Sequence, residues 1–459
     1  MQKPFGKPNR LLKYLITAIL LVVPLYPKFP FITVPGTYVS IRLEDFLMAF
    51  SIFFLAVLVY PKMRRFFTNN VNLSVFIFLL TALVSLGSAV LVTQTVLPQL
   101  GFLHWARRVE YIIPFFLGVF ALRGKGKDLE YYLKVIMIAL IILFIYGFGQ
   151  KNFNWPIIIT QNPEYAQGIA LRYVPGSHIN SSFAGHYDLG TFLVLLLPIF
   201  ICLFFLVKDW RTKVYLFLVT SAGLWLLAYS GSRISSFSYL VAASSALFLI
   251  KRYKYIPVVV FFSFLFFSMS PNLMARYTRI IEVSIARVKS LSNSIYFPKQ
   301  KIAYAQEGII LPERRPVATP TPTPQPVFED RSTSIRLNVE WPRAIRAFSK
   351  NPLLGTGYSS ITLATDNDFL RLLGETGVLG FLAFFLIFIR IAEFVKSAYP
   401  FDKNYSGIKL AFVAGTVGSI PGIFLNAVFL DIFEASKFAI IFWLVMGMLL
   451  ASVKRKYYE

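Results

Sequence analysis

One arginine is placed to bind an oxyanion. Arg233 stands in Tyr229-Ser-Gly-Ser-Arg-Ile-Ser-Ser236, a small polar break between two apolar runs. No Asp or Glu occurs between Asp209 and Glu282, so Arg233 has no counterion nearby in the sequence. Small residues before a helix N-terminus, followed by an arginine, suit a phosphate through backbone N–H groups and a bidentate guanidinium. The alternative is an arginine that extends to the membrane interface.

A second polar segment carries Arg172 in Leu171-Arg-Tyr-Val-Pro-Gly-Ser-His-Ile-Asn-Ser-Ser-Phe-Ala-Gly-His186. The Pro-Gly pair predicts a turn, and Arg172 could contact a phosphate or sugar or could be an interfacial arginine. His178 and His186 share this loop. None of the three histidines has an i,i+4 partner or an HExxH context, so we predict no metal site.

The densest group of polar residues lies at 365–375. Asp366, Asn367 and Asp368 stand where a helix should start, so the simplest interpretation is an N-cap. Arg371 and Glu375 are four residues apart and could pair along that helix. Upstream, Asn351-Pro-Leu-Leu-Gly-Thr-Gly357 has glycines that permit a tight turn and close helix packing.

The composition requires membrane-spanning elements to position these residues. Of the 459 residues, 56% are hydrophobic and only 15% are charged, against roughly a quarter in soluble domains. This excludes a water-soluble enzyme, a disordered chain and a disulfide scaffold, and the single cysteine, Cys202, lies in an apolar run. We expect an all-α polytopic membrane protein. The net charge of +24 fits the positive-inside rule and does not indicate nucleic acid.

Twelve segments are apolar enough to serve as transmembrane helices of about 20 residues. They are 11–27, 43–60, 73–92, 109–122, 131–149, 187–207, 213–229, 234–250, 255–269, 377–396, 407–427 and 433–452. Clusters of Lys and Arg fall before the first span, after every second span and at the C-terminal end. The clusters lie at 3–13, 62–65, 123–127, 208–213, 251–254, 396–409 and 454–456. Both termini are therefore expected in the cytoplasm.

Two long outer segments interrupt this pattern and divide the chain. We expect nine transmembrane helices in 1–269 with an outer loop at 150–186, a large extracytoplasmic loop at 270–368, and three helices and a cytoplasmic tail in 369–459. Within the large loop, 276–295 predicts a basic amphipathic helix on the membrane surface. The Pro-rich 316–326 predicts an extended spacer. A short helix is expected at 332–349, disturbed by Pro342.

These motifs together resemble the O-antigen ligase and polymerase superfamily. The resemblance rests mainly on Arg336…Trp341…Asn351-Pro-Leu-Leu-Gly-Thr-Gly and on Asp366-Asn…Phe369-Leu-Arg-Leu-Leu-Gly-Glu-Thr-Gly-Val-Leu-Gly380. The Ser230-Gly-Ser-Arg233 turn, the Arg172 loop and the twelve-span layout are similar to its other features. The resemblance implies a metal-independent, cofactor-free glycosyltransferase at the outer face of a bacterial cytoplasmic membrane. Its substrates would be a polyprenyl-diphosphate-linked glycan donor and a glycan acceptor.

The resemblance also implies roles for particular residues. Catalytic roles are expected for Asp366, Arg233 and Arg172, with the two arginines stabilising the diphosphate leaving group. Substrate binding is expected for Arg336, Asn367, His178, His186 and Glu375. Ligases of the family have a His at the position of Asp366, and this departure favours a polymerase or a divergent member.

The sequence leaves three functions open. The first is polymerisation of lipid-linked repeats into a surface polysaccharide, with other envelope-polysaccharide assembly proteins as possible partners. The second is ligase-like transfer of a finished glycan to lipid or protein. The third is a twelve-helix transporter or flippase, which fits the hydropathy but lacks visible internal symmetry.

Overall fold

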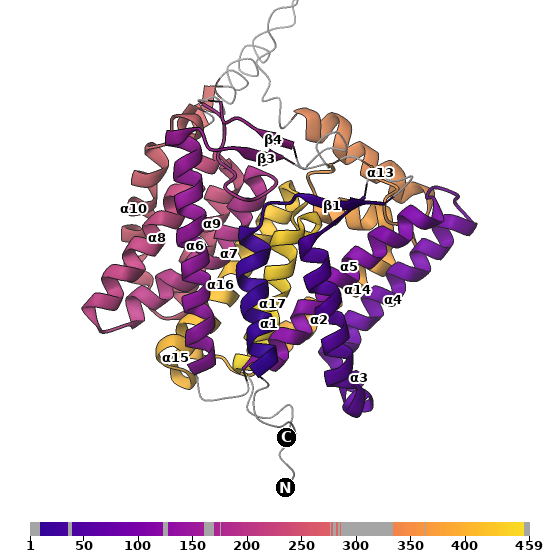
Figure 1. Cartoon of the computed structure of the whole chain (residues 1–459), viewed down its shortest axis with the longest axis horizontal. Helices are drawn as coiled ribbons and strands as arrows, with labels where there is room; N and C mark the ends of the chain where they lie inside the picture. The colour runs from indigo at the N-terminus through magenta and orange to yellow at the C-terminus, as the bar shows by residue number, and fades with distance from the viewer. Residues whose placement is uncertain are drawn as a thin grey trace, which may run out of the picture.

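The structure is a computed structural model, in which the chain forms a bundle of long helices (Figure 1). It describes residues 10–34, 39–122, 127–159, 169–174, 176–275, 277–278, 281–282, 285, 334–362 and 364–453. Most of the predicted large loop, including most of the amphipathic 276–295 and all of the Pro-rich 316–326, lies outside these residues.

Seven helices in the described ranges are long and apolar enough to cross a membrane. They are α4 Asn70–Leu91, α6 Lys127–Phe153, α7 His186–Leu206, α8 Trp210–Ser230, α14 Asp368–Lys396, α16 Gly407–Phe429 and α17 Ser436–Val453. Five further helices coincide with the remaining predicted spans: α1 Arg10–Leu25, α2 Leu43–Val59, α5 Pro98–Ala121, α9 Arg233–Leu249 and α10 Ile256–Ser268. The predicted all-α polytopic membrane protein is confirmed. The count of twelve crossings stays a prediction.

The helix predicted at 109–122 is much longer than expected. In the structure α5 starts at Pro98, where the missing N–H costs nothing in the first helical turn. The added turns contain His104, Arg107 and Arg108, which lower the hydropathy and hid them from a search for apolar runs.

Short elements connect the long helices. They are α3 Met63–Phe67, α13 Trp341–Lys350, α15 Phe401–Asn404, the 3₁₀ turns Tyr60–Lys62, Tyr253–Tyr255 and Ile432–Glu434, and the π-helical turn η3 Arg336–Glu340. Two antiparallel hairpins, which the sequence did not predict, pair β1 Pro30–Thr33 with β2 Ser40–Arg42 and β3 Ile157–Ile159 with β4 Ile169–Leu171. Figure 1 shows the hairpins and α13 at one end of the bundle, while α1 starts and α17 ends at the opposite end.

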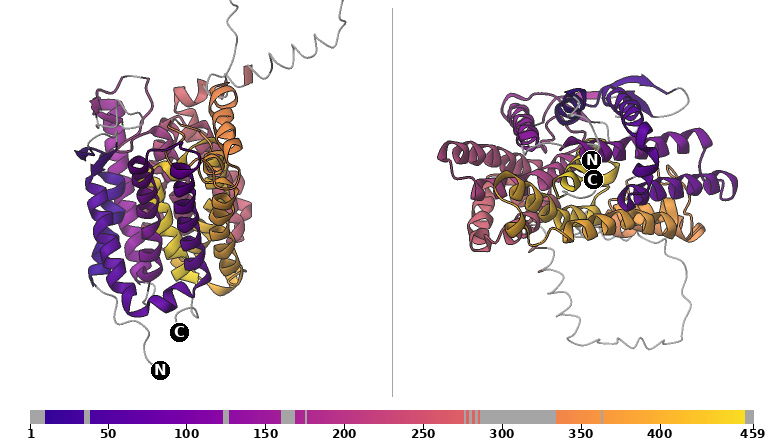
Figure 2. Two further views of the ribbon diagram at one scale, coloured as in Figure 1. Left: turned by 90° about the vertical axis from the view of Figure 1, so that its right-hand side faces the viewer. Right: turned by 90° about the horizontal axis from the view of Figure 1, so that it is seen from below.

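The core is built around α17 and α7, the two most buried of the seven long apolar helices. Figure 2 shows α17, in yellow, inside the bundle. Helix α17 packs against α5 where Gly447 faces Gly118, and a Cβ on either glycine would overlap the backbone of the partner helix. Helix α16 packs in the same way against α7 and α9. Small residues at the contacts let the backbones approach closely, as is common between helices in membranes.

Pro342 shapes the short helix that the sequence placed at 332–349. The proline stands near the start of α13, directly after the π-helical turn, in which the N–H of Trp341 bonds to the carbonyl of Arg336. A proline inside a helix removes one backbone hydrogen bond and clashes with the preceding turn. The wider π turn accommodates this ring, so the predicted disturbance takes the form of a π-helical segment.

Candidate functional site

The first turn of α14 is fixed by two aspartates from different parts of the chain. The Asp431 carboxylate accepts hydrogen bonds from the N–H groups of Thr365 (2.7 Å) and Asn367 (3.1 Å). In return, the Asp368 carboxylate accepts from the N–H groups of Ile432 (2.7 Å) and Phe433 (3.2 Å). The loop before α14 and the loop before α17 therefore hold each other in place.

The predicted N-cap of α14 is Asn367. Its side-chain oxygen accepts a hydrogen bond from the N–H of Leu370 at 2.9 Å. Asp366, one residue earlier, has a positive φ of 49° and lies outside the helix. The capping interpretation therefore holds for Asn367, and Asp366 is left without a role in capping the helix.

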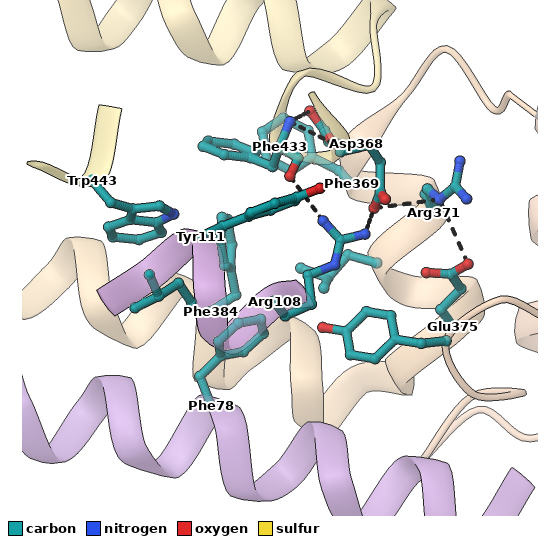
Figure 3. Close-up of a pocket in the computed structure, with 14 residues that line it drawn as sticks. Phe78, Arg108, Tyr111, Asp368, Phe369, Arg371, Glu375, Phe384, Phe433 and Trp443 are labelled. Carbon is teal, nitrogen blue, oxygen red and sulfur yellow. Dashed lines mark hydrogen bonds and ion pairs between the residues drawn. The ribbon is translucent and has the colours of Figure 1, made fainter. Parts of the chain in front are cut away.

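Arg371 and Glu375 form the predicted i,i+4 pair, with Nε and Oε1 3.6 Å apart. Arg371 also contacts Asp431 at 3.1 Å and Glu434 at 3.5 Å, and it donates to the carbonyl of Ile361. Arg108 from α5 pairs with Glu434 and donates to the carbonyl of Phe433 (Figure 3). Alternating charges thus join α5, α14 and the 431–434 loop.

These side chains line a small cavity of about 40 Å³ beneath the start of α14. Its polar wall contains Arg108, Tyr358, Asp368, Arg371, Glu375 and Glu434, and its other wall is mostly aromatic (Figure 3). A space of this size holds one or a few water molecules and no sugar. The charged side chains of this wall bind one another or backbone N–H groups, and these contacts hold the loops that carry Asp366 and Asp431.

Asp366 contacts Arg336, which the sequence placed 30 residues upstream. The Nε and Nη2 atoms of Arg336 lie 3.0 and 2.7 Å from Oδ2 of Asp366. The Asp366 side chain is 26% exposed, so it can be reached from outside the bundle. Burial raises the pKa of Asp366 above its ordinary value, and the nearby Arg336 charge opposes this rise. Asp366 is therefore a half-buried carboxylate with one oxygen bound to an arginine.

Glu340 is a second carboxylate at this site. It ends the π-helical turn that begins at Arg336. Burial, helped by the negative charge of Asp366, raises the pKa of Glu340 to about 7. Glu340 was not among the predicted site residues, because nothing in its local sequence distinguishes it from an ordinary surface glutamate.

The glycines of the Asn351–Gly357 motif allow close packing, as expected. The N–H of Gly357 donates to the carbonyl of Glu375 at 2.8 Å, and a Cβ on Gly355 would overlap the backbone at Glu375. Helix α14 is interrupted at this level by Gly377, whose φ of 64° and ψ of −172° are not helical. Residues 351–357 therefore hold α14 through backbone contacts, and we call this contact the 351–357 clasp.

A second group of predicted site residues, His178, His186 and Arg233, lies at the N-terminal ends of α7 and α9. The N–H of Ile179 donates to the carbonyl of Tyr229, and a Cβ on Gly231 would overlap the His178 ring. The His178 and His186 rings are 4.6 Å apart. The structure thus brings both histidines to the turn that precedes Arg233.

Arg233 and Arg172 differ in their surroundings. Arg233 is the first residue of α9 and half-buried, and Ser232 before it caps the helix by accepting from the N–H of Ser235. Arg172 follows β4 and is exposed. No sequence motif linked Arg108, Asp431 and Glu434 to the site. The available signal was the placement of ionisable residues within or beside apolar spans, which usually requires partners.

The comparison with known families agrees with the residues that carry the resemblance. Residues 216–385, less than half of the chain, match the family model described as O-antigen ligase. The match includes the Arg233 turn, α13 and the start of α14. No curated protein matches the chain.

Proposed function

Because residues 216–385 match the family model described as O-antigen ligase, we propose that the chain is a membrane glycosyltransferase of the O-antigen ligase and polymerase superfamily. It polymerises oligosaccharide repeats carried on polyprenyl diphosphate into a surface polysaccharide, with inversion and without a metal or cofactor. The donor and the acceptor are both lipid-linked glycans. Other envelope-polysaccharide assembly proteins would supply the repeats and receive the product.

The observation that carries the proposal is the Asp366–Arg336 contact beside the first turn of α14. Asp366 is a partly exposed carboxylate whose pKa is raised, as a base for a sugar hydroxyl requires. It is held in position by Arg336, while Asn367 completes the neighbouring helix cap. In the proposed step the acceptor oxygen attacks the anomeric carbon, its proton passes to this carboxylate site, and the bond to the diphosphate breaks.

The diphosphate is the group on which negative charge accumulates as the bond breaks. We assign its stabilisation to Arg233, which starts α9 where the helix dipole also favours an anion. Arg172 is the second arginine proposed for this role. His178 and His186, which adjoin the Arg233 turn, are proposed to contact the substrate near the diphosphate.

The remaining predicted substrate contacts have different surroundings. Arg336 is proposed to bind the acceptor beside Asp366, and Asn367, which is buried and caps α14, is proposed to support this contact from the backbone next to Asp366. Glu375 is buried and paired with Arg371, so it would act by holding Arg371. The end of the bundle with α13 and the hairpins is proposed to face outward, which leaves both termini in the cytoplasm of a bacterial cell (Figure 1).

The experiment uses the purified full-length protein in liposomes with a lipid-linked repeat from the source cells. A ladder of chain lengths, resolved by electrophoresis, is expected from a polymerase. One product of defined length on a lipid or protein acceptor would support a ligase. A substrate that crosses the bilayer without any covalent change would overturn the glycosyltransferase proposal.

A further inference from the structure

Three polar atoms at the η3–α13 junction lack hydrogen-bond partners. They are Oε2 of Glu340, Nε1 of Trp341 and Nη1 of Arg343, all shielded from solvent and unbonded within the part of the chain that the structure describes. A buried polar group without a partner costs about 1–3 kcal/mol. Three such groups within four residues indicate that a polar ligand completes this site.

The junction is held rigidly against α14. Gly374 of α14 lies so close to α13 that a Cβ there would stand 3.0 Å from the carbonyl oxygen of Ala344. Ala344 is fully buried at this contact. The three polar residues lie within the four positions before Ala344, so the same contact fixes their position relative to the start of α14.

The junction also adjoins the Asp366 carboxylate. Arg336, which binds Asp366 at 2.7 Å, lies four residues before Glu340 on the same π-helical turn. Glu340 therefore shares the surroundings of Asp366, and four charged groups act on it: Asp366, Arg336, Asp431 and Arg343.

The unbonded atoms consist of one acceptor and two donors. A sugar hydroxyl both donates and accepts hydrogen bonds, so neighbouring hydroxyls on one ring could satisfy all three atoms. The Trp341 ring, which is tilted 41° to the Phe429 ring at 6.4 Å, adds an apolar surface beside them. An inorganic anion could use the two donors but would be repelled by Glu340.

We propose that Glu340, Trp341 and Arg343 form the subsite for the acceptor sugar, and that Glu340 holds the proton released by its hydroxyl. This inference rests on the proposed function. The acceptor O–H bond breaks as the new bond to the anomeric carbon forms. The electrons of the old glycosyl bond leave with the diphosphate. The proton enters the Asp366 and Glu340 pair and comes to rest on Glu340.

The ionisation of Glu340 supports this assignment. Its pKa of about 7 lies near the working pH, where a general base is most effective. Only the ionised form can accept the proton, so wild-type turnover should rise with pH through about 7 and then level off. Below about pH 6 the Glu340 carboxylate would be mostly protonated, so turnover would be slow.

The test compares Glu340→Gln with Glu393→Gln, a matched change at an exposed glutamate on α14. Glu340→Gln should lower the maximal turnover at least a hundredfold and remove the rise near pH 7, at normal protein level and with no decrease in melting temperature. Glu340→Asp should restore part of the activity. If Glu340→Gln kept the wild-type plateau with only a shifted pH profile, Glu340 would act on Asp366 through its charge alone and the proposal would be wrong.

Sugar binding is measured without turnover. The probe is the repeat oligosaccharide from the surface polysaccharide of the source cells, freed of its lipid. Trp341→Phe and Arg343→Lys should each weaken its binding roughly tenfold, because each removes or misplaces one donor. Unchanged affinity in both variants would contradict the subsite. If the wild type formed no glycosidic bond while these variants lost affinity, the proposed function would fail and the subsite would stand.

Discussion

Asp368 and Asp431 each cap the backbone segment that carries the other. Asp431 accepts from the N–H groups of residues 365 and 367, and Asp368 accepts from those of residues 432 and 433. The exchange joins the start of α14 to the loop before α17. Because Asp366 lies between the two N–H groups that Asp431 binds, this reciprocal capping sets the direction of the Asp366 side chain.

Replacing Asp431 should therefore damage both stability and activity. Asp431→Asn removes the charge that faces Arg371 and presents an N–H₂ group where backbone N–H groups require an acceptor. Hydrogen bonds to charged groups contribute about 1.5–3 kcal/mol, so a loss of that size in the free energy of unfolding is expected. Thermal unfolding in detergent measures it. The control is Asp402→Asn, which weakens the pair between half-buried Asp402 and exposed Lys251 and should change the melting temperature little.

Asp366→Asn separates a chemical role for this residue from a structural one. Asn is among the residues that tolerate a positive φ best, and the helix is capped by Asn367. Expression and thermal stability should thus stay near wild type, while turnover in the liposome assay falls at least a hundredfold. Wild-type turnover in this variant would remove Asp366 from the catalytic residues.

The fold was predictable because crossing a membrane requires a local property, a run of about 20 apolar residues. Each predicted span coincides with a helix for this reason. The first turns of α5 were missed because Arg107 and Arg108 interrupt the apolar pattern. The hairpins were missed because strands of three or four residues have too few positions to show alternation.

The site was predictable only in part. Contacts between residues close in the sequence could be predicted, and contacts between distant residues could not. Arg371 and Glu375 are four residues apart, so helix geometry alone predicts their contact. Arg108 and Glu434 are more than 300 residues apart, and their contact depends on how α5, α14 and α17 pack. The Arg336–Asp366 pair is intermediate, since both residues were predicted site residues but no sequence pattern predicted their contact.

Gly377 should tolerate no side chain. It adopts a φ of 64° at the break in α14, and a Cβ there would overlap the carbonyl of Leu353. Gly377→Ala should therefore release the 351–357 clasp and lower both the melting temperature and turnover. Gly87→Ala is the matched control, because a Cβ at this position would have no atom within 4 Å apart from neighbouring atoms of its own helix. Since Ala is favoured over Gly inside a helix, this control should unfold at the same or a higher temperature, and equal melting of the two variants would contradict the clasp.

Glu340 should also make stability depend on pH. Its pKa is about 7 in the folded protein and 4.5 in an ordinary environment. Between these values the unfolded state releases the proton while the folded state keeps it, so the Glu340 contribution to stability decreases as pH rises from 4.5 to 7. Glu340→Gln lacks this contribution. The melting temperature of the variant minus that of the wild type should thus increase over this range and then stay constant, whereas a difference independent of pH would show that Glu340 titrates normally.

Arg233 is the most direct test of diphosphate stabilisation. Arg233→Ala should lower chain extension roughly 10–150-fold, which corresponds to about 1.5–3 kcal/mol for hydrogen bonds to a charged group. The fold should survive, because the contact from the Tyr277 hydroxyl goes to the backbone carbonyl of Arg233, which alanine retains. Arg233→Lys keeps the charge but loses the bidentate geometry, so intermediate activity is expected. Arg211→Ala, at the exposed start of α8 and at the opposite end of that helix from the Arg233 turn, is the control and should extend chains normally. Normal polymer length and amount from Arg233→Ala, at normal protein level, would rule out this arginine as the group that stabilises the leaving diphosphate.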